Sequence, residues 1–239
     1  MASGPHPPGF AVIDVETTGF EPECERIVEV GVVLLGPDGE ETGSFSTLID
    51  PGRPPGPTSV HRITAAMLEG APTFAAVRPY LAEALSGRVL VGHNVDRFDL
   101  AFLRAECERA GGRSLVPAEL ATIDTLDLAQ SHLELPGQAR LVDCCTYYGL
   151  TWADHHTALG DARVTAALFR AMRGQLGDDT LDLAARLDTA AATSWPDGSS
   201  EAPAVVIRPE GPIPPPGRGS RVSPVRRLGR AVRRLWHRG

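Results

Sequence analysis

The feature that most constrains the fold is a short apolar run near the start of the chain that ends in two closely spaced carboxylates. Residues 10–13 read Phe-Ala-Val-Ile, and Asp14-Val15-Glu16 follows before a Thr-Thr-Gly turn. Such a run predicts a buried β-strand. Because side chains two apart on a strand share a face, Asp14 and Glu16 project together, about 6.6 Å apart along the strand, while Val15 points into the core.

Two carboxylates at the end of a buried strand repel each other and lose hydration. A divalent cation, or a pair of them, compensates both effects, and carboxylate oxygens suit Mg²⁺ or Mn²⁺. The alternative is an ordinary solvated strand end. The pair by itself does not decide between the two interpretations, because single motifs are weak signals.

Composition narrows the classes of protein to consider. The chain has 239 residues, 42% of them hydrophobic, enough for one domain and a tail. No apolar run approaches the roughly 20 residues of a membrane span, and residues 1–8 lack the pattern of a signal peptide. The four cysteines show neither a C-x-x-C pair nor disulfide spacing. A reduced, cytoplasmic setting is therefore expected.

Charge is divided unevenly along the chain. Residues 217–239 hold eight Arg and no acid, whereas the remainder holds 15 Arg against 30 acidic residues. An acidic body is a poor non-specific binder of nucleic acid, since that affinity comes mostly from neutralised phosphates. A polyanionic substrate would have to be held by bound metal and local backbone contacts.

The order of apolar runs and turn signals predicts the fold class. Strands are expected at residues 10–14, 27–35, 41–49, 89–91 and 121–123. Helices are expected at residues 63–68, 74–85, 100–109, 125–133, 139–148, 157–173 and 180–193. Three strands followed by alternating helix and strand indicate a mixed sheet with helices packed on it.

A second group of polar residues follows the strand at residues 89–91. It begins at His93-Asn94 and continues to Phe98-Asp99 at the start of the next helix. Asp99 falls in the first helical turn, where Asp is also a common cap that complements the helix dipole. Considered alone, Asp99 is better interpreted as a cap.

A third group lies around the last strong helix. His156 and Asp161 are five residues apart, so they cannot share one helical face. We expect His156 on the loop before the helix and Asp161 inside it, on a mostly apolar stripe with Thr165 and Leu168. A carboxylate on such a stripe needs a partner. A structural or solvated histidine remains the alternative for His156.

Together the three groups resemble a known family. The order Asp14-x-Glu16-Thr17-Thr18-Gly19, His93-Asn94 with Phe98-Asp99, and His156-x4-Asp161 is similar to the motifs of the DEDDh exonucleases. That group contains the epsilon proofreading subunit of bacterial DNA polymerase III, ribonuclease T and oligoribonuclease. Residues 60–74 and 123–129 resemble the segments that link its motifs. Three ordered motifs are far more specific than one.

The resemblance implies a ribonuclease-H-like α/β fold: a mixed five-stranded sheet with helices on both faces. It also implies metal-dependent 3′-to-5′ hydrolysis of nucleic acid to nucleoside 5′-monophosphates. Two divalent ions, Mg²⁺ or Mn²⁺, would be held by Asp14, Glu16, Asp99 and Asp161, with His156 as general base. The implied substrate-binding residues are Thr17, Thr18, His61, His93 and Asn94.

Two assignments within these motifs have alternatives. Epsilon-like members usually place the second-motif Asp four residues after the Asn, but here Asn94 and Asp99 are five apart. Asp99 keeps the Phe-Asp register and the helical apolar pattern, and Asp96 is the fallback. His155 neighbours His156, but only His156 has the family spacing to Asp161.

The expected organisation is an exonuclease domain at residues 8–175, then a linker and Arg-rich tail at residues 176–239, largely disordered. The tail's apolar residues recur at helical spacing, so a basic amphipathic helix that contacts nucleic acid, a lipid surface or a partner such as a polymerase is the alternative.

The expected function is exonuclease action on single-stranded 3′ ends, with DNA favoured over RNA, in proofreading or repair. An exoribonuclease that trims RNA 3′ ends is one alternative. A catalytically silent module that binds nucleic acid or a polymerase is the alternative from another class.

Overall fold

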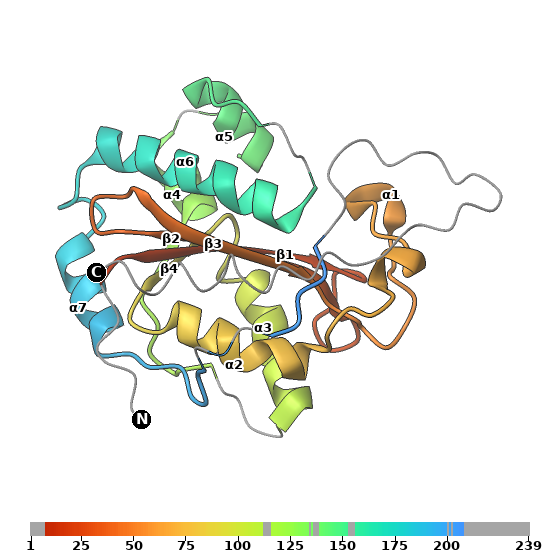
Figure 1. Ribbon diagram of the computed structural model, residues 1–239. Coiled ribbons are helices and arrows are strands. Elements are labelled where there is room, and N and C mark those ends of the chain that lie inside the picture. Colours follow the sequence, from red (N-terminus) through yellow and green to blue (C-terminus); the bar gives the residue numbers. More distant parts are fainter. Residues whose placement is uncertain are drawn as a thin grey trace.

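The computed structural model describes residues 8–111, 116–133, 135, 139–152, 156–199, 201 and 203–207. Its centre is one five-stranded sheet (Figure 1). The strands are β1 (Phe10–Thr17), β2 (Ile27–Leu35), β3 (Glu41–Leu48), β4 (Val89–Gly92) and β5 (Thr122–Asp124). Their order across the sheet is β3-β2-β1-β4-β5.

Strand directions in this sheet are mixed, as predicted. The pairs β1–β2 and β2–β3 are antiparallel, whereas β1–β4 and β4–β5 are parallel. The first three strands thus form a meander, and the last two are reached through helical crossovers. The ribonuclease-H-like fold class is confirmed.

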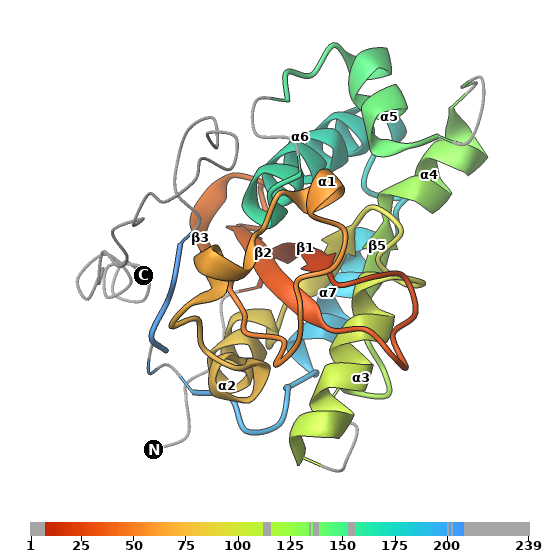
Figure 2. The same ribbon diagram turned by 90° about the vertical axis from the view of Figure 1, so that its right-hand side faces the viewer.

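Helices cover both faces of the sheet (Figures 1 and 2). The helices are α1 (Thr58–His61), η1 (Ala65–Leu68, a 3₁₀ helix), α2 (Phe74–Leu85), α3 (Asp99–Gly111), α4 (Thr125–His132), α5 (Leu141–Tyr148), α6 (Ala158–Leu176) and α7 (Leu183–Ala191). Figure 1 shows α2 and α3 below the sheet and α4, α5 and α6 above it. Most of these helices match those expected from the sequence.

The alternation of side chains along β1 decides which helix each residue meets. Ala11, Ile13 and Val15 join the buried cluster that contains α2 and α3. Phe10 and Val12 face the opposite way and pack with residues of α6 and α7. Because the period of a strand is two, the next side chains on that second face are those of Asp14 and Glu16. The sheet therefore directs both carboxylates toward α6.

Residues beyond the expected boundary at residue 175 pack on the body of the protein. Leu183 of α7 is 2% exposed, and Trp195 is 5% exposed in the cluster with α2 and α3. The amide of Leu48 donates to the carbonyl of Val206, so residues 203–207 run along β3, the edge strand. These apolar side chains cover parts of the core and the edge of β3, so the described residues after α6 are packed.

The packed structure continues at least to residue 207, and the division at residue 175 remains a proposal about where the catalytic unit ends. The Arg-rich segment at residues 217–239 lies outside the described residues. Among the described helices, none is both long and apolar enough to cross a membrane.

Candidate metal centre and active site

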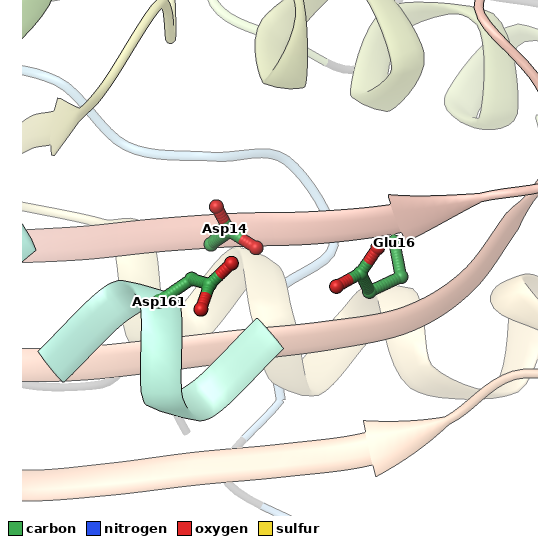
Figure 3. A group of neighbouring side chains, drawn as sticks. All are labelled: Asp14, Glu16 and Asp161. Carbon is green, nitrogen blue, oxygen red and sulfur yellow. The ribbon is translucent and has the colours of Figure 1, made fainter. Parts of the chain in front are cut away.

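Three carboxylates from two elements converge beside the centre of the sheet (Figure 3). Asp14 and Glu16 come from β1, and Asp161 comes from the first turn of α6. One oxygen of each lies within 4.8 Å of the others. The structure therefore brings together residues that are far apart in the sequence, as the three-motif interpretation requires.

The close approach of α6 to the sheet depends on two residues of β2. Gly31 lies opposite Asp14 in the β1–β2 register, and a Cβ there would lie 2.3 Å from the carbonyl carbon of Ala158. Glu29, opposite Glu16, accepts a hydrogen bond from the amide of Ala158 at 3.1 Å. The absence of a side chain at Gly31 and the hydrogen bond to Glu29 together allow the start of α6 to pack directly against β2.

The carboxylate of Asp14 is in an unfavourable environment for its charge. Burial raises the pKa of Asp14 well above its ordinary value, and the neighbouring carboxylates of Asp99, Asp161, Glu16 and Glu29 raise this pKa further. Such crowding is costly unless positive charge or protons compensate it. The site is thus strongly biased toward binding a proton or a cation.

Asp99 lies close enough to act on Asp14 but is held by the backbone of β1. Its side chain is 3% exposed, and Oδ1 accepts the amide N–H of Val15 at 3.0 Å. Burial raises the pKa of Asp99 to about 7, although the backbone hydrogen bonds oppose this rise. The bond from Val15 fixes this carboxylate beside the strand that carries Asp14 and Glu16.

The extra residue in the second motif is absorbed by the backbone before α3. Asn94 has a left-handed φ of 74°, and the amide of Leu100 donates to the carbonyl of Val95, five residues back. This spacing is that of a π-type turn, which takes up one additional residue without changing the helix that follows. The charge of Asp99 therefore still acts on Asp14 despite the lengthened spacing.

Asp96, the fallback for the second motif, lies in a different group. It is exposed and neighbours Asp124 and Asp127. Asp124 accepts the amides of Asn94 and Leu126, and Asp127 forms an ion pair with Arg97 at 2.8 Å. Backbone amides and Arg97 thus compensate this second acidic group, and the geometry favours Asp99 as the partner of Asp14.

The donor set of the main cluster fits a divalent cation. It consists of carboxylate oxygens, which Mg²⁺ and Mn²⁺ prefer, and three of them already converge. Asp99 is not one of these three converging carboxylates, but its charge raises the pKa of Asp14, so it is the candidate fourth ligand. The acidic cluster is consistent with metal binding, and the identity of each ligand remains a prediction.

His156 and Trp152 flank Asp161 from the loop before α6. The amide of His156, which has a left-handed φ of 62°, donates to Oδ1 of Asp161 at 3.2 Å. The indole Nε1 of Trp152 donates to the same oxygen at 3.0 Å. The residue His156 is exposed, and Thr157 caps α6 by accepting the amide of Gly160. His156 is thus on the loop and Asp161 in the helix, as predicted; His155 lies outside the described residues.

Thr17 and Thr18 form the turn that leaves β1. The hydroxyl of Thr17 donates to the carbonyl of Gly19 at 2.6 Å. The hydroxyl of Thr18 donates to Glu25 and accepts the amide of Arg26 at 3.0 Å. Both threonines are 7% exposed. Their hydroxyls hold the turn directly after Glu16, and a contact with substrate remains a prediction.

His61 is placed differently from the other predicted site residues. It is 1% exposed, its Nε2 lies 3.1 Å from the carbonyl of Pro55, and its Nδ1 accepts the amide of Ile63 at 3.0 Å. These bonds fix the tautomer with the proton on Nε2. In this conformation both ring nitrogens bind backbone, and the predicted contact with a terminal nucleotide stays untested.

His93 and Asn94 make their hydrogen bonds toward α4 and α5. The ring of His93 lies 3.0 Å from both the hydroxyl of Thr125 and the carbonyl of Ala139. The amide of Asn94 donates to Asp124 at 2.8 Å. These contacts join the end of β4 to the start of α4. A role in substrate binding stays a prediction for both residues.

Sequence reasoning missed three residues that shape the site. They are Glu29, Gly31 and Trp152. A signal for the first two was present, because a carboxylate and a glycine interrupt the otherwise apolar run at residues 27–35. Trp152 carried no such signal, since its partner Asp161 is known only from the tertiary contact.

Comparison with known proteins places this geometry in a family. The RNase_T family model, described as an exonuclease, matches residues 11–169. The epsilon subunit of DNA polymerase III from Treponema pallidum is 37% identical over 169 residues, covering 68% of this chain and 75% of the relative. A PolC-type DNA polymerase III from Clostridium perfringens is 34% identical over 163 residues, covering 67% of this chain. The chain spans only 11% of that polymerase.

Solved exonuclease structures are similar to this chain in fold. Exonuclease X in complex with 5′ overhanging duplex DNA has a TM-score of 0.52 and 28% identity, covering 70% of this chain and 92% of its own. Exonuclease I from E. coli, in complex with a dT13 oligonucleotide, has a TM-score of 0.60 and 19% identity, covering 71% of this chain and 42% of its own. The second likeness concerns the fold alone.

Proposed function

Since this chain belongs to the RNase_T family of exonucleases, within the DEDDh group of 3′-to-5′ enzymes, we propose that it shortens single-stranded DNA from the 3′ end and releases nucleoside 5′-monophosphates. The observation that carries this proposal is the convergence of Asp14, Glu16 and Asp161 beside a nearly enclosed Asp99. Exonuclease X, the structural relative with 28% identity, is itself described in complex with 5′ overhanging duplex DNA, which supports DNA as the substrate.

Each side chain has a proposed role in this reaction. Asp14, Glu16, Asp99 and Asp161 would hold two divalent ions, Mg²⁺ or Mn²⁺. When bound, two such ions polarise a phosphodiester and stabilise the charge that develops on the attacking and leaving oxygens. His156 takes a proton from the attacking water, a role that suits an imidazole near neutral pH. Its exposed position on the loop leaves it accessible to a strand end.

The direct test uses end-labelled substrates. The protein is incubated with Mg²⁺ or Mn²⁺ and with 5′-labelled single-stranded DNA or RNA of equal sequence. We expect a ladder that shortens from the 3′ end of DNA, with nucleoside 5′-monophosphates as products by chromatography. EDTA and the Asp14→Asn substitution should each abolish the ladder, because the cation site is lost.

A matched pair of variants tests the second motif. Asp99→Asn should remove activity, whereas Asp96→Asn should retain it, because the charge of Asp99 acts on Asp14 and Asp96 belongs to the separate group with Asp124 and Asp127. The reverse result would assign Asp96 as the ligand. Equal inertness of wild type and Asp14→Asn toward every substrate would support a catalytically silent binding module, and faster RNA cleavage would support an exoribonuclease.

We also propose that the enzyme works in proofreading or repair. The similarity to an epsilon subunit supports this setting. A polymerase or another partner would bind through the Arg-rich residues 217–239, or that segment would bind the substrate itself. Deleting residues 217–239 tests both ideas: an unchanged salt dependence of KM would exclude the substrate role, and unchanged co-purification with a polymerase would exclude the partner role.

A further inference from the structure

The indole of Trp152 makes a direct contact with a proposed metal ligand from outside the motifs. Its Nε1 donates to Oδ1 of Asp161 at 3.0 Å, and the amide of His156 donates to the same oxygen at 3.2 Å. Trp152 is half-buried and Asp161 is 9% exposed. Two N–H donors from one loop thus converge on one oxygen of this carboxylate.

These donors restrain how the carboxylate of Asp161 can rotate. Asp161 faces the carboxylates of Asp14 and Glu16, whose negative charge tends to push it away. A carboxylate without fixed donors would turn toward solvent to reduce that repulsion. Hydrogen bonds that orient a ligand in this way make metal sites tighter, because the ligand is already in place when the cation arrives.

The indole is well suited to this task. A tryptophan side chain has only two rotatable bonds, and its N–H lies at the edge of a rigid ring. The contact also joins the loop that carries His156 to the helix that carries Asp161. Together with the bond from the amide of His156, this contact ties Trp152 and His156 to the same carboxylate.

We infer that Trp152 is a positioning residue that holds the Asp161 carboxylate for a divalent cation and anchors the loop of His156. This inference rests on the proposed function, because it requires Asp161 to be a metal ligand. The competing explanation is that Trp152 only packs against α6. Trp152→Phe separates the two, since phenylalanine keeps most of the ring surface and lacks the N–H donor.

Trp195 supplies a matched control. It is the other tryptophan among the described residues, and it is buried in the cluster with α2 and α3, on the opposite face of the sheet from Asp161. Trp195→Phe thus measures the general effect of replacing a tryptophan. Trp236, outside the described residues, is changed to Phe in every protein so that it contributes no fluorescence.

Affinity for Mn²⁺ alone is then measured by calorimetry on the metal-free proteins, with thermal melts to verify folding. Trp152→Phe should weaken the affinity by about 10-fold or more, the usual effect of losing a hydrogen bond to a metal ligand. Trp195→Phe should leave it unchanged, and Asp161→Asn should weaken it most. The kcat of Trp152→Phe should fall more than its KM rises.

Luminescence of Tb³⁺ provides a second measurement that does not require the Trp152 variant to fold. In the Trp195→Phe protein, excitation of Trp152 should sensitise bound Tb³⁺, and Mn²⁺ should quench this signal by competition. Absence of sensitised emission would overturn the inference. Wild-type Mn²⁺ affinity in Trp152→Phe, together with reduced affinity in Asp161→Asn, would also overturn the inference, but this result would still support the metal site. Wild-type affinity in Asp161→Asn would overturn the proposed metal site and the inference together.

Discussion

Asp99 illustrates how one residue links the proposed chemistry to stability. Its carboxylate is almost fully enclosed, and burial raises its pKa to about 7 in the absence of metal. The amide of Val15 keeps the side chain in place through Oδ1. Because asparagine also offers an oxygen to this amide, Asp99→Asn removes the titratable charge with little change of shape.

The raised pKa predicts the direction of a pH effect. The folded metal-free protein retains a proton on Asp99 that the unfolded chain loses above pH 4, so stability falls as pH rises from about 4 to about 7. The contribution is at most about 4 kcal/mol for a shift of this size.

Urea denaturation in EDTA at several pH values measures this effect. The loss of stability with rising pH should be smaller in Asp99→Asn than in wild type, and Mn²⁺ should reverse the loss in wild type. Identical pH profiles of the two proteins would contradict the assignment of this titration to Asp99.

Phe20 is an exposed aromatic residue four positions after Glu16. It follows the Thr17–Gly19 turn directly after β1 and is 77% exposed. Aromatic residues make up only 5% of the chain, so few rings are available for stacking on bases. A base stacked on an aromatic side chain contributes about 1–3 kcal/mol to binding of a single strand.

Phe20→Ala should therefore weaken binding of single-stranded DNA by about that amount. Fluorescence anisotropy in an inactive Asp14→Asn background measures the affinity without degradation of the probe. Tyr147→Ala is the control, since Tyr147 is an exposed ring on α5. Equal losses in both variants, or none in Phe20→Ala, would exclude a specific stacking role.

At the scale of elements, the site depends on how closely α6 approaches β2. Gly31 leaves the space that the backbone of Ala158 occupies, and Glu29 accepts the first free amide of the helix. A carboxylate at a helix N-terminus also complements the helix dipole. These two contacts with β2 fix the first turn of α6, and only in this position does Asp161 reach Asp14.

Gly31→Ala should displace the start of α6, since its Cβ would lie 2.3 Å from the carbonyl carbon of Ala158. We expect a loss of about 1–3 kcal/mol in stability, as for other overpacked sites, together with a large loss of activity. Thermal melts and the ladder assay measure both effects.

Gly174→Ala is the matched control in the same helix. A Cβ at Gly174 meets no atom within 4 Å, and alanine favours the helical conformation by about 1 kcal/mol over glycine. This variant should gain stability and keep activity. Full activity in Gly31→Ala would show that the fit between α6 and β2 does not position Asp161.

At the scale of the whole molecule, the residues after α6 close the core. Leu181, Leu183 and Trp195 are all at most 5% exposed, and the amide of Trp195 donates to the hydroxyl of Ser86. Val206 accepts from Leu48 along the edge of β3. A core that loses these contacts exposes apolar surface on both faces of the sheet.

A chain that ends at residue 176 should therefore be several kcal/mol less stable than one that ends at residue 207, because each fully buried large apolar side chain contributes about 1.5–3 kcal/mol. Urea denaturation of the two truncated proteins tests this. Equal midpoints would mean that the catalytic unit ends at residue 175, as the sequence suggested, and that the later contacts are dispensable.

The sequence alone predicted the five strands, most of the helices and the order of the motifs. Apolar periodicity and turn residues are local properties, and they placed these elements to within a few residues, whereas α1 at Thr58–His61 was not predicted. Alternation along β1 also determined that Asp14 and Glu16 share a face. The ordered motifs then identified the family, since each motif adds information that the others lack.

Only the tertiary structure decided which residues support those motifs. The Phe-Asp register of the sequence already favoured Asp99 over Asp96, and only the structure shows the π-type turn before α3 that absorbs the extra residue. The roles of Gly31 and Trp152 arise from contacts with α6, more than 120 positions away for Gly31 and nine positions away for Trp152. These contacts depend on how segments pack against one another, and local sequence patterns predict the segments but not their packing.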